Sequence, residues 1–256
     1  MTECSAPIAL VTGAAKRIGR AIAEDLGANG FAVAVHANGS AGAAEETAAA
    51  IRSGGGTAEV FIADLEDPDA VAGLVARVAD RLGAPRLLVN NASIFEPDFG
   101  DAFDAALFDR HMAVHVKAPV ALTAAMAEHL PAESAGGLVV NLIDQRVWKL
   151  TPQHFSYTLS KAALWTATRT LAMTHAPRLR VNAIAPGPTL PSPRQSEEDF
   201  ARQVAAVPLQ RAPDLISFGR TIRYLFDTPS VTGTMIPLDG GQHLAWETPD
   251  VAGVSE

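Results

Sequence analysis

Short apolar segments alternate with longer segments of helical periodicity along almost the whole chain. The short segments are rich in β-branched residues and contain few polar ones, which is typical of strands whose two faces are both covered by helices. Because consecutive parallel strands need a helical crossover, this alternation indicates a parallel sheet. We therefore predict seven strands, at residues 7–11, 31–36, 58–63, 87–90, 137–143, 179–185 and 234–238.

The segments between the predicted strands carry apolar residues on one helical face, as from Ile18 to Leu26 and from Val71 to Leu82. The alanine-rich residues 41–56 resemble low complexity, but a short helix closed by a glycine turn explains them better. Right-handed crossovers place helices on both faces of such a sheet. We expect a doubly wound, Rossmann-type α/β fold that binds its ligands at the carboxyl ends of the strands.

Composition limits the domain organisation and the class of partner. Of the 256 residues 48% are hydrophobic, enough for one sizeable core, so we expect a single domain over residues 1–256. A net charge of −8 without a long basic run argues against nucleic acid or an anionic membrane as partner. We predict no signal peptide or membrane anchor, and the single cysteine, Cys4, suits a reducing cytoplasm.

Three segments fall outside the predicted core. Residues 186–213 begin with several prolines, follow the sixth strand and later become amphipathic. They form either a lid over the site or an ordinary surface excursion. Residues 1–5 and 247–256 are expected to be flexible, although the tail from Trp246 onwards would also suit docking on a partner subunit.

A glycine-containing loop, TGAAKRIGR at residues 12–20, directly follows the first strand and opens the first helix. That position suits a dinucleotide, because helix N-terminal amides hold a pyrophosphate while glycines let the backbone approach it. An ordinary strand-to-helix turn is the alternative. The loop alone therefore suggests, but does not establish, a nucleotide site.

A second cluster combines an acid, a phenol and a cation. Tyr157 and Lys161 lie four residues apart and would share one helical face, and Asp144 ends the fifth strand. A tyrosine has an ordinary pKa near 10, so a catalytic role requires tuning, and we expect the ammonium of Lys161 to lower the pKa of Tyr157. Asp144 as a strand-end cap is the alternative.

Together these motifs resemble those of the short-chain dehydrogenase/reductase family, in the family's order. Thr12, Gly13 and Gly19 match its T-G-x-x-x-G-x-G with Arg17 in place of the middle glycine, and Tyr157 and Lys161 match its Y-x-x-x-K. The resemblance also covers Asp64-Leu65, NNAS at 90–93 and the PG pair at 186–187. It implies a cofactor site formed by Gly13, Lys16, Arg17, Ile18, Gly19, Asp64, Leu65, Asn91, Ala92, Ser93, Tyr157, Lys161, Pro186 and Gly187.

Charge after the second strand predicts which cofactor is bound. Members of this fold that prefer NAD place an acid there for the ribose 2′-hydroxyl. Here the segment reads VHANGS, without an acid, so we predict NADPH. The candidate ligands of its 2′-phosphate are Lys16, Arg17, His36, Asn38 and Ser40, and Arg17 as a solvated side chain is the alternative.

Asp144 occupies the place of the serine that most members of the family use at the substrate carbonyl. Pteridine reductases and dihydromonapterin reductases carry an aspartate there, and NNASIF at 90–95 resembles their sequence. The resemblance implies that Ser93, Phe95 and Arg17 contact the substrate, Phe95 by stacking. Phe95 as a simple loop hydrophobe is the alternative.

One position departs from the family. The family's catalytic asparagine, whose backbone carbonyl holds a water in a proton relay to the lysine, corresponds to His115. A histidine can keep a backbone contact or can alter the relay. We find no metal-ligand spacing among His36, His154, His243 and Cys4, and predict no metal.

The sequence thus predicts an NADPH-dependent reductase of a C=N bond in a substrate of the dihydrobiopterin, dihydromonapterin or dihydrofolate class. Tyr157 would protonate the ring nitrogen, Asp144 would relay the proton, and Lys161 would orient the ribose. Two alternatives remain, a general carbonyl reductase or alcohol dehydrogenase such as a 3-oxoacyl reductase, and a non-catalytic NADPH-binding sensor. By resemblance we also expect a cytoplasmic homotetramer.

Overall fold

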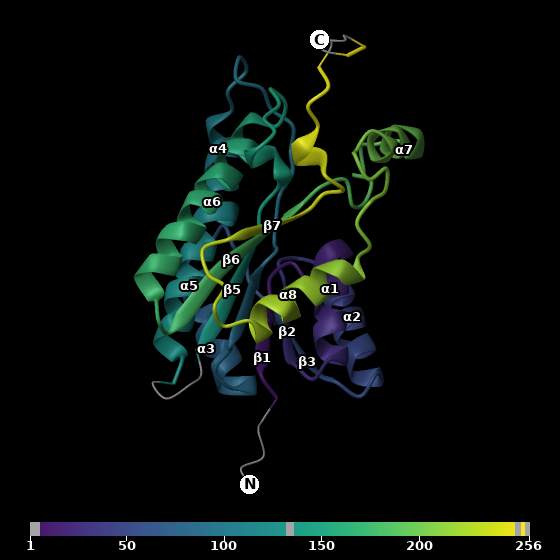
Figure 1. Cartoon of the computed structure of the whole chain (residues 1–256). Coiled ribbons are helices and arrows are strands. Elements are labelled where there is room, and N and C mark those ends of the chain that lie inside the picture. The colour runs from purple at the N-terminus through teal and green to yellow at the C-terminus, as the bar shows by residue number, and fades with distance from the viewer. Residues whose placement is uncertain (1–5, 132–135, 249–251, 254–256) are drawn as a thin grey trace.

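The computed structural model describes residues 6–131, 136–248 and 252–253, and its centre is a parallel sheet of seven strands. The strand order is β3-β2-β1-β4-β5-β6-β7, so the chain winds outwards from β1 in one direction and from β4 in the other (Figure 1). The strands are β1 (Ile8–Val11), β2 (Ala32–Ala37), β3 (Thr57–Ile62), β4 (Leu87–Asn90), β5 (Gly137–Leu142), β6 (Leu179–Pro186) and β7 (Met235–Leu238).

Helices cover both faces of this sheet. One layer contains α1 (Arg17–Ala28), α2 (Ala41–Ser53) and α8 (Ile216–Asp227), and the other contains α3 (Pro68–Leu82), α5 (Ala118–His129) and α6 (Phe155–His175) (Figure 1). Shorter helices lie in the connections: α4 (Ala105–Met112), the π-helical turn η1 (Ala113–Lys117), the 3-10 turns η2 (Gln145–Val147) and η3 (Gln242–Leu244), and α7 (Glu197–Ala205).

Alternating side chains of each strand enter opposite layers of the core. In β1, Ala9 and Val11 pack beneath α1, whereas Leu10 packs beneath α3 and α5, and all three are fully buried. Each buried large aliphatic side chain stabilises the fold by roughly 1.5–3 kcal/mol through removal of apolar surface from water. Double-sided burial explains why the central strands β1, β2 and β4 consist almost entirely of apolar residues.

The predicted fold is confirmed. All seven predicted strands are present, each within one residue of its expected limits. The alanine-rich segment forms α2, and the chain leaves it through Gly54 and Gly55, of which Gly55 adopts the left-handed backbone at φ 85°. The expectations for residues 1–5 and for part of 247–256 fall on residues 1–5, 249–251 and 254–256, which lie outside the described residues.

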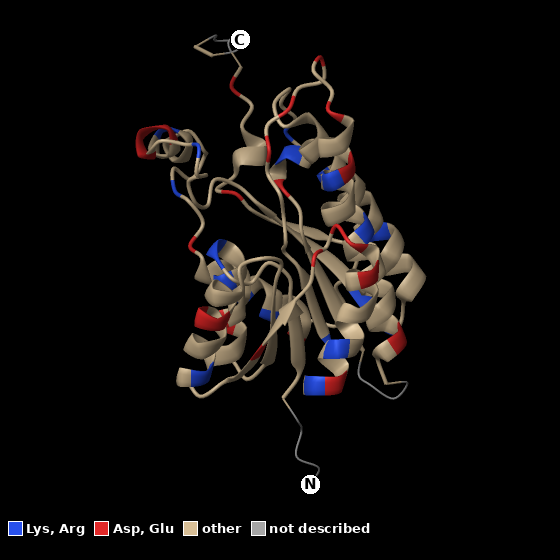
Figure 2. Ribbon diagram, turned by 180° about the vertical axis from the view of Figure 1, so that it is seen from behind, with Lys and Arg blue, Asp and Glu red and all other residues tan. Residues whose placement is uncertain are grey.

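Charge is distributed over the outside of the two helical layers. Figure 2 shows basic and acidic residues interspersed along the outer helices. Within the described part of the chain, no helix is both long and apolar enough to cross a bilayer.

The loops that follow β1, β4, β5 and β6 gather at the carboxyl end of the sheet. Helix α7, which belongs to the predicted lid, stands clear of both helical layers at this end (Figure 1). The topology therefore brings the glycine-containing loop, the NNAS segment, Asp144 and the segment after Pro186 to one edge of the sheet.

Candidate active site

Hydrogen bonds join the loop after β1 to the loop after β4. The Thr12 hydroxyl donates to the carbonyl of Val89 (3.3 Å) and accepts from the backbone N–H groups of Asn91 and Ala92 (3.0 Å each). The Asn91 amide donates back to the carbonyls of Thr12 (2.9 Å) and Gly13 (3.1 Å). Two segments far apart in the sequence thus form one rigid wall.

The two glycines of the first motif are required by backbone conformation and by space. Gly13 has a φ of 63°, which an L side chain adopts only at a cost. At Gly19 an added Cβ would lie 2.2 Å from the Gly13 carbonyl oxygen and 2.4 Å from Nδ2 of Asn91. The first turn of α1 therefore packs against backbone, which leaves its N-terminal amides in reach of a phosphate.

Arg17 begins α1 in the left-handed conformation, with φ 55°. This backbone favours glycine, the residue that the family pattern has at this place, so the arginine costs on the order of 1 kcal/mol. Its guanidinium donates to the carbonyls of Pro191 (3.0 Å) and Leu190 (3.3 Å) in the predicted lid. The residue also borders both cavities described below.

A cavity of about 420 Å³ lies over the glycine-containing loop. Its wall includes most of the predicted cofactor residues, and Ser40 lies outside it. The predicted residues on the wall are Gly13, Lys16, Arg17, Ile18, Gly19, His36, Asn38, Asp64, Leu65, Asn91, Ala92 and Ser93.

The contacts of His36 differ from our prediction that it is a candidate ligand of the 2′-phosphate. Its Nδ1 accepts from the Gly13 N–H (3.2 Å), and Nε2 faces the Ala63 carbonyl (3.1 Å), so both ring nitrogens are engaged. Burial lowers the pKa of His36 to about 4. A neutral imidazole without a free nitrogen supplies no charge to a phosphate; it fixes the loop after β1 against the end of β3.

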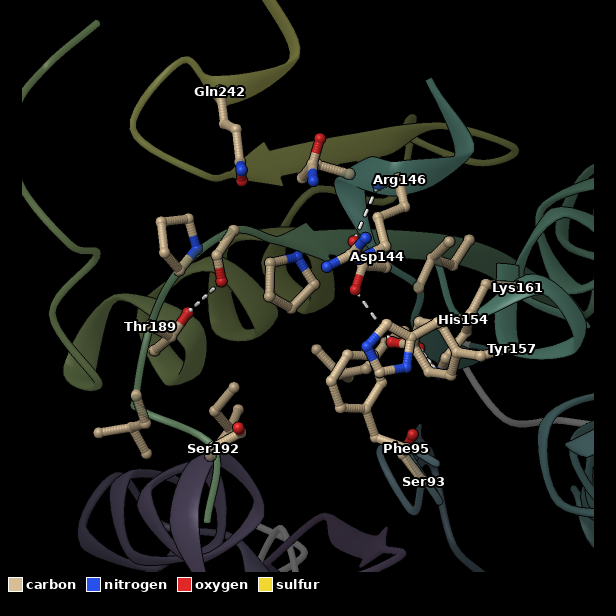
Figure 3. Close-up of a pocket in the computed structure, with 18 of the residues that line it drawn as sticks. Ser93, Phe95, Asp144, Arg146, His154, Tyr157, Lys161, Thr189, Ser192 and Gln242 are labelled. Atoms are coloured by element: carbon tan, nitrogen blue, oxygen red, sulfur yellow. Dashed lines mark hydrogen bonds between the residues drawn. The ribbon is translucent and has the colours of Figure 1, made fainter. Parts of the chain in front are cut away.

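The acid, the phenol and the ammonium meet at the second cavity, of about 470 Å³ (Figure 3). The Tyr157 hydroxyl donates to Oδ2 of Asp144 (3.0 Å), and the Arg146 N–H donates to Oδ1 (2.8 Å). Lys161 Nζ donates to the carbonyl of Leu142 (2.8 Å) and lies 5.6 Å from the centre of the Tyr157 ring. Strand β5 and helix α6 thus position the three groups that the sequence singled out.

These groups shift one another's pKa values. Burial, and then the neighbouring Asp144, raise the pKa of Tyr157 well above its usual value. Burial also raises the pKa of Asp144, and it lowers that of Lys161 to about 8. The protein groups alone therefore do not lower the pKa of Tyr157, contrary to our expectation for Lys161. Burial of the phenol raises this pKa most, and the carboxylate that replaces the family's serine raises it further because it opposes formation of a second negative charge.

As a cap, Asp144 also has a structural function. Its side chain accepts from the Arg146 N–H at the start of η2, which is the role of the alternative interpretation. Its second oxygen remains on Tyr157. The two interpretations are therefore compatible, since one carboxyl group performs both functions.

His115 lies in η1, behind the site. The ring is buried and contacts the hydroxyls of Ser93 through Nε2 (2.9 Å) and of Ser160 through Nδ1 (2.8 Å). Its ring is packed edge-on against that of Tyr157, with 5.4 Å between their centres. His115 therefore reaches the cavity only through Ser93, and the relay through its backbone carbonyl stays a prediction.

Phe95 points into the second cavity, but one of its faces is covered. The His154 ring stacks on it with 3.9 Å between ring centres and 13° between planes, and Figure 3 shows the two rings overlapping. The Arg146 guanidinium lies 5.9 Å from the Phe95 ring centre. A flat substrate that stacks on Phe95 would share it with these two side chains.

Several wall residues are not identifiable as site residues from the sequence. Most come from turns that meet only in the folded chain: Arg146, Gln153, His154, Thr189, Gln195 and Gln242. His154 is the exception with a partial sequence signal, because it lies about one helical turn before Tyr157.

The segment 186–213 forms part of the cavity wall. Pro186 and Gly187 border the cavity, and Gly187 has no room for a side chain, because a Cβ would lie 2.6 Å from Cα of Asp239. Further along, Arg194 donates to Oε2 of Glu96 (2.9 Å) and to the carbonyl of Phe95. Of the two alternatives for this segment, its position favours the lid.

Residues 7–201 match the short chain dehydrogenase family, and the chain belongs to this family. The FolM alternative dihydrofolate reductase 1 from Brucella canis, in a crystal structure complexed with NADP, is 62% identical, with a TM-score of 0.93 over 96% of this chain and 98% of that one. The angucycline C-6 ketoreductase LanV with bound NADP is 30% identical, with a TM-score of 0.84 over 93% and 96% of the two chains.

An uncharacterized oxidoreductase from Methylorubrum extorquens is 30% identical over 249 residues, which cover 94% of this chain and 99% of that protein. The predicted family is therefore confirmed over nearly the full length of the chain. Among the residues that the structure describes, no three His, Cys, Asp or Glu side chains are placed to hold a metal ion.

Proposed function

We propose that the protein is an NADPH-dependent reductase of a C=N bond in a pterin-like substrate of the dihydrobiopterin, dihydromonapterin or dihydrofolate class. The hydrogen bond between the carboxyl of Asp144 and the hydroxyl of Tyr157 carries this proposal. A carboxylate beside a developing oxyanion is unfavourable, whereas a carboxyl that passes a proton onward suits a ring nitrogen. The 62% identity to the FolM alternative dihydrofolate reductase supports the same substrate class.

The cofactor site fits NADPH. Neither Gly13 nor Gly19 has room for a Cβ, because it would meet Ala92 or the Gly13 carbonyl, so the loop lies close against the start of α1, whose N-terminal amides suit a diphosphate. Lys16 and Asn38 border the cavity, and the segment VHANGS at the end of β2 contains no acid that would repel a 2′-phosphate. NADP is bound in the structures of the FolM protein and LanV. When bound, NADPH supplies the hydride.

Each protein group then has one task at a stated atom. The Tyr157 hydroxyl delivers a proton to the substrate nitrogen, and the Asp144 carboxyl, whose pKa is raised by burial, returns a proton to Tyr157. Lys161, held by the Leu142 carbonyl, places a positive charge beneath Tyr157 and orients the ribose. Ser93 and Phe95 position the substrate ring, and Arg17 and Arg194 hold the lid segment on the wall.

The test is oxidation of NADPH by the purified protein with dihydrobiopterin, dihydromonapterin and dihydrofolate, beside an acetoacetyl thioester. We expect turnover of at least one pterin, and a fall of at least about 100-fold in Asp144→Ser, since general acid–base groups contribute about 10²–10⁴-fold. Tyr157→Phe is the matched variant that keeps the ring. Unchanged turnover in folded Tyr157→Phe protein would contradict the proposal.

Reduction of a ketone is the second candidate function, and the 30% identity to the ketoreductase LanV favours it. In that reaction the residue in the serine's place donates to the substrate carbonyl, which Asp144 can do only when its carboxyl is protonated. If the protein turns over the thioester alone, and Asp144→Ser increases that turnover, the protein is a ketone reductase and not a pterin reductase. Tight NADPH binding without turnover of any substrate would instead indicate a sensor.

The assembly and cell compartment belong to the same proposal. We infer a cytoplasmic, single-domain enzyme that forms a homotetramer, by similarity to its family. The single seven-stranded sheet supports one domain over residues 1–256. Size-exclusion chromatography with light scattering tests the tetramer, and a monomer of 26.8 kDa would overturn it.

A further inference from the structure

His115 links the substrate side of the site to the helix that carries Tyr157. Its ring is 1% exposed and stands between Ser93 and Ile94 on one side and Ser160 on the other. Since both ring nitrogens have partners with defined donor roles, the position of the ring proton follows from those partners.

The contacts at both ends of the ring select the same tautomer. The Ile94 backbone N–H donates to Nε2 (3.2 Å), so Nε2 carries no proton. At the other end, the Ser160 hydroxyl donates to the carbonyl of Tyr157 (2.7 Å) and can therefore only accept from Nδ1 (2.8 Å). The proton lies on Nδ1, and Nε2 is an acceptor.

The charge state of the ring agrees with this arrangement. Burial, the ammonium of Lys161 and the neighbouring His111 lower the pKa of His115 well below its usual value. The imidazole therefore stays neutral at physiological pH, and its acceptor nitrogen is permanent.

The orientation of the Ser93 hydroxyl follows. The Ser93 oxygen lies 2.9 Å from Nε2 and 3.2 Å from the Ile94 carbonyl oxygen. Because Nε2 has no proton, both atoms are acceptors for the Ser93 hydroxyl, and Nε2 is the nearer of the two. The proton of Ser93 is thereby directed away from the cavity, and the oxygen turns its lone pairs towards the cavity that it borders.

We propose that His115 is a positioning residue that fixes Ser93 as a hydrogen-bond acceptor, so that the site selects a substrate ring with an N–H donor, such as an amino group, over one with a carbonyl oxygen. The inference rests on the proposed function, which supplies the pterin-like ring. It explains what the departure from the family's asparagine achieves. An asparagine amide contains both a donor and an acceptor and leaves the polarity of Ser93 open.

Neutron crystallography of the NADPH complex tests the first step without reference to any substrate. We expect hydrogen on Nδ1 of His115, none on Nε2, and the Ser93 hydrogen directed at Nε2. A hydrogen on Nε2, or a Ser93 hydrogen directed into the cavity or at the Ile94 carbonyl, would overturn the inference. This experiment decides the polarity even if the protein proves not to reduce pterins.

Equilibrium binding tests the consequence. Pterin and 2-deaminopterin differ in one group, the 2-amino group of pterin being a hydrogen atom in 2-deaminopterin, and their affinities for the NADP complex are measured by fluorescence quenching. We expect wild type to prefer pterin by about tenfold, the difference that one hydrogen bond of matched polarity makes. His115→Asn and Ser93→Ala should each reduce this preference to about twofold or less.

The double variant separates positioning from general damage. If His115 acts through Ser93, adding His115→Asn to Ser93→Ala changes the preference no further. His111→Asn is the matched control, because His111 is equally buried one turn away but contacts Ser156 (2.7 Å) rather than Ser93. An unchanged preference for pterin in His115→Asn, or an equal loss of that preference in His111→Asn, would refute the positioning role. If His115→Asn fails to fold, His115→Gln takes its place.

Discussion

Replacement of Asp144 by asparagine isolates the electrostatic coupling at the centre of the site. The carboxyl oxygen lies 3.0 Å from the Tyr157 oxygen, and two unit charges at that separation repel by about 5–6 kcal/mol at an effective dielectric constant of 20. This repulsion is an upper bound, because Asp144 borders the open cavity and solvent screens the pair. We expect the pKa of Tyr157 to fall in Asp144→Asn, because the neighbouring carboxylate raises it.

The chain is well suited to a direct measurement, because it contains only two tyrosines. Tyr224 is 54% exposed, and Tyr224→Phe leaves Tyr157 as the sole phenol. In that background the ultraviolet absorbance of the phenolate is titrated with and without Asp144→Asn, and circular dichroism monitors folding. An unchanged or higher pKa in the asparagine variant would refute the coupling and leave burial alone as the cause.

Three further predictions concern stability. Gly19→Ala should destabilise the protein by about 1–3 kcal/mol and weaken NADPH binding, because the new Cβ would lie 2.2 Å from a backbone oxygen. Gly42→Ala, whose Cβ would lie in open space on α2, should stabilise the protein by about 0.5–1 kcal/mol. Urea unfolding compares the free energies of unfolding of the two variants. The unfolded state binds a proton at His36 below pH 6.5, whereas the folded state binds it only near pH 4. The protein therefore loses up to about 3 kcal/mol of stability as pH falls between these values. His36→Gln should flatten this part of the curve of stability against pH. Burial lowers the pKa of Lys161 from 10.5 to about 8, so the wild-type protein gains stability as pH rises from 8 to 10.5. Lys161→Met should be inactive but about 2 kcal/mol more stable than wild type at pH 7. If this advantage persists at pH 11, where the lysine is neutral in both states, the burial of its charge is not the cause.

The fold follows from the sequence because both faces of the sheet are buried. A strand such as β4 is buried at every position and begins with three apolar residues, so its limits are visible without knowledge of its neighbours. Local motifs were predictable because their residues lie close together in the sequence. Gly13 and Gly19 satisfy backbone demands of one loop, and Tyr157 and Lys161 lie one turn apart on one helix.

Roles that depend on contacts between distant segments were not predictable. His36 was a candidate phosphate ligand until the folded chain placed the Gly13 N–H and the Ala63 carbonyl on its two nitrogens. His154 lacked any partner in the sequence, and its stacking on Phe95 requires the loop after β4 to meet the start of α6. Sequence spacing reports neither the occupancy of a ring nitrogen nor the face of an aromatic ring.

Arg17 shows how a local cost can identify a function that the fold does not require. A glycine would adopt its φ of 55° without strain, so the backbone does not explain an arginine there. The side chain provides the explanation, since it spans from the cofactor loop to the lid carbonyls of Leu190 and Pro191 and borders both cavities. A phosphate of the proposed cofactor would accept charge-assisted hydrogen bonds from the same guanidinium. We therefore predict that binding of the cofactor and the position of the lid are coupled through this side chain, which the strained backbone directs to the boundary between the two cavities.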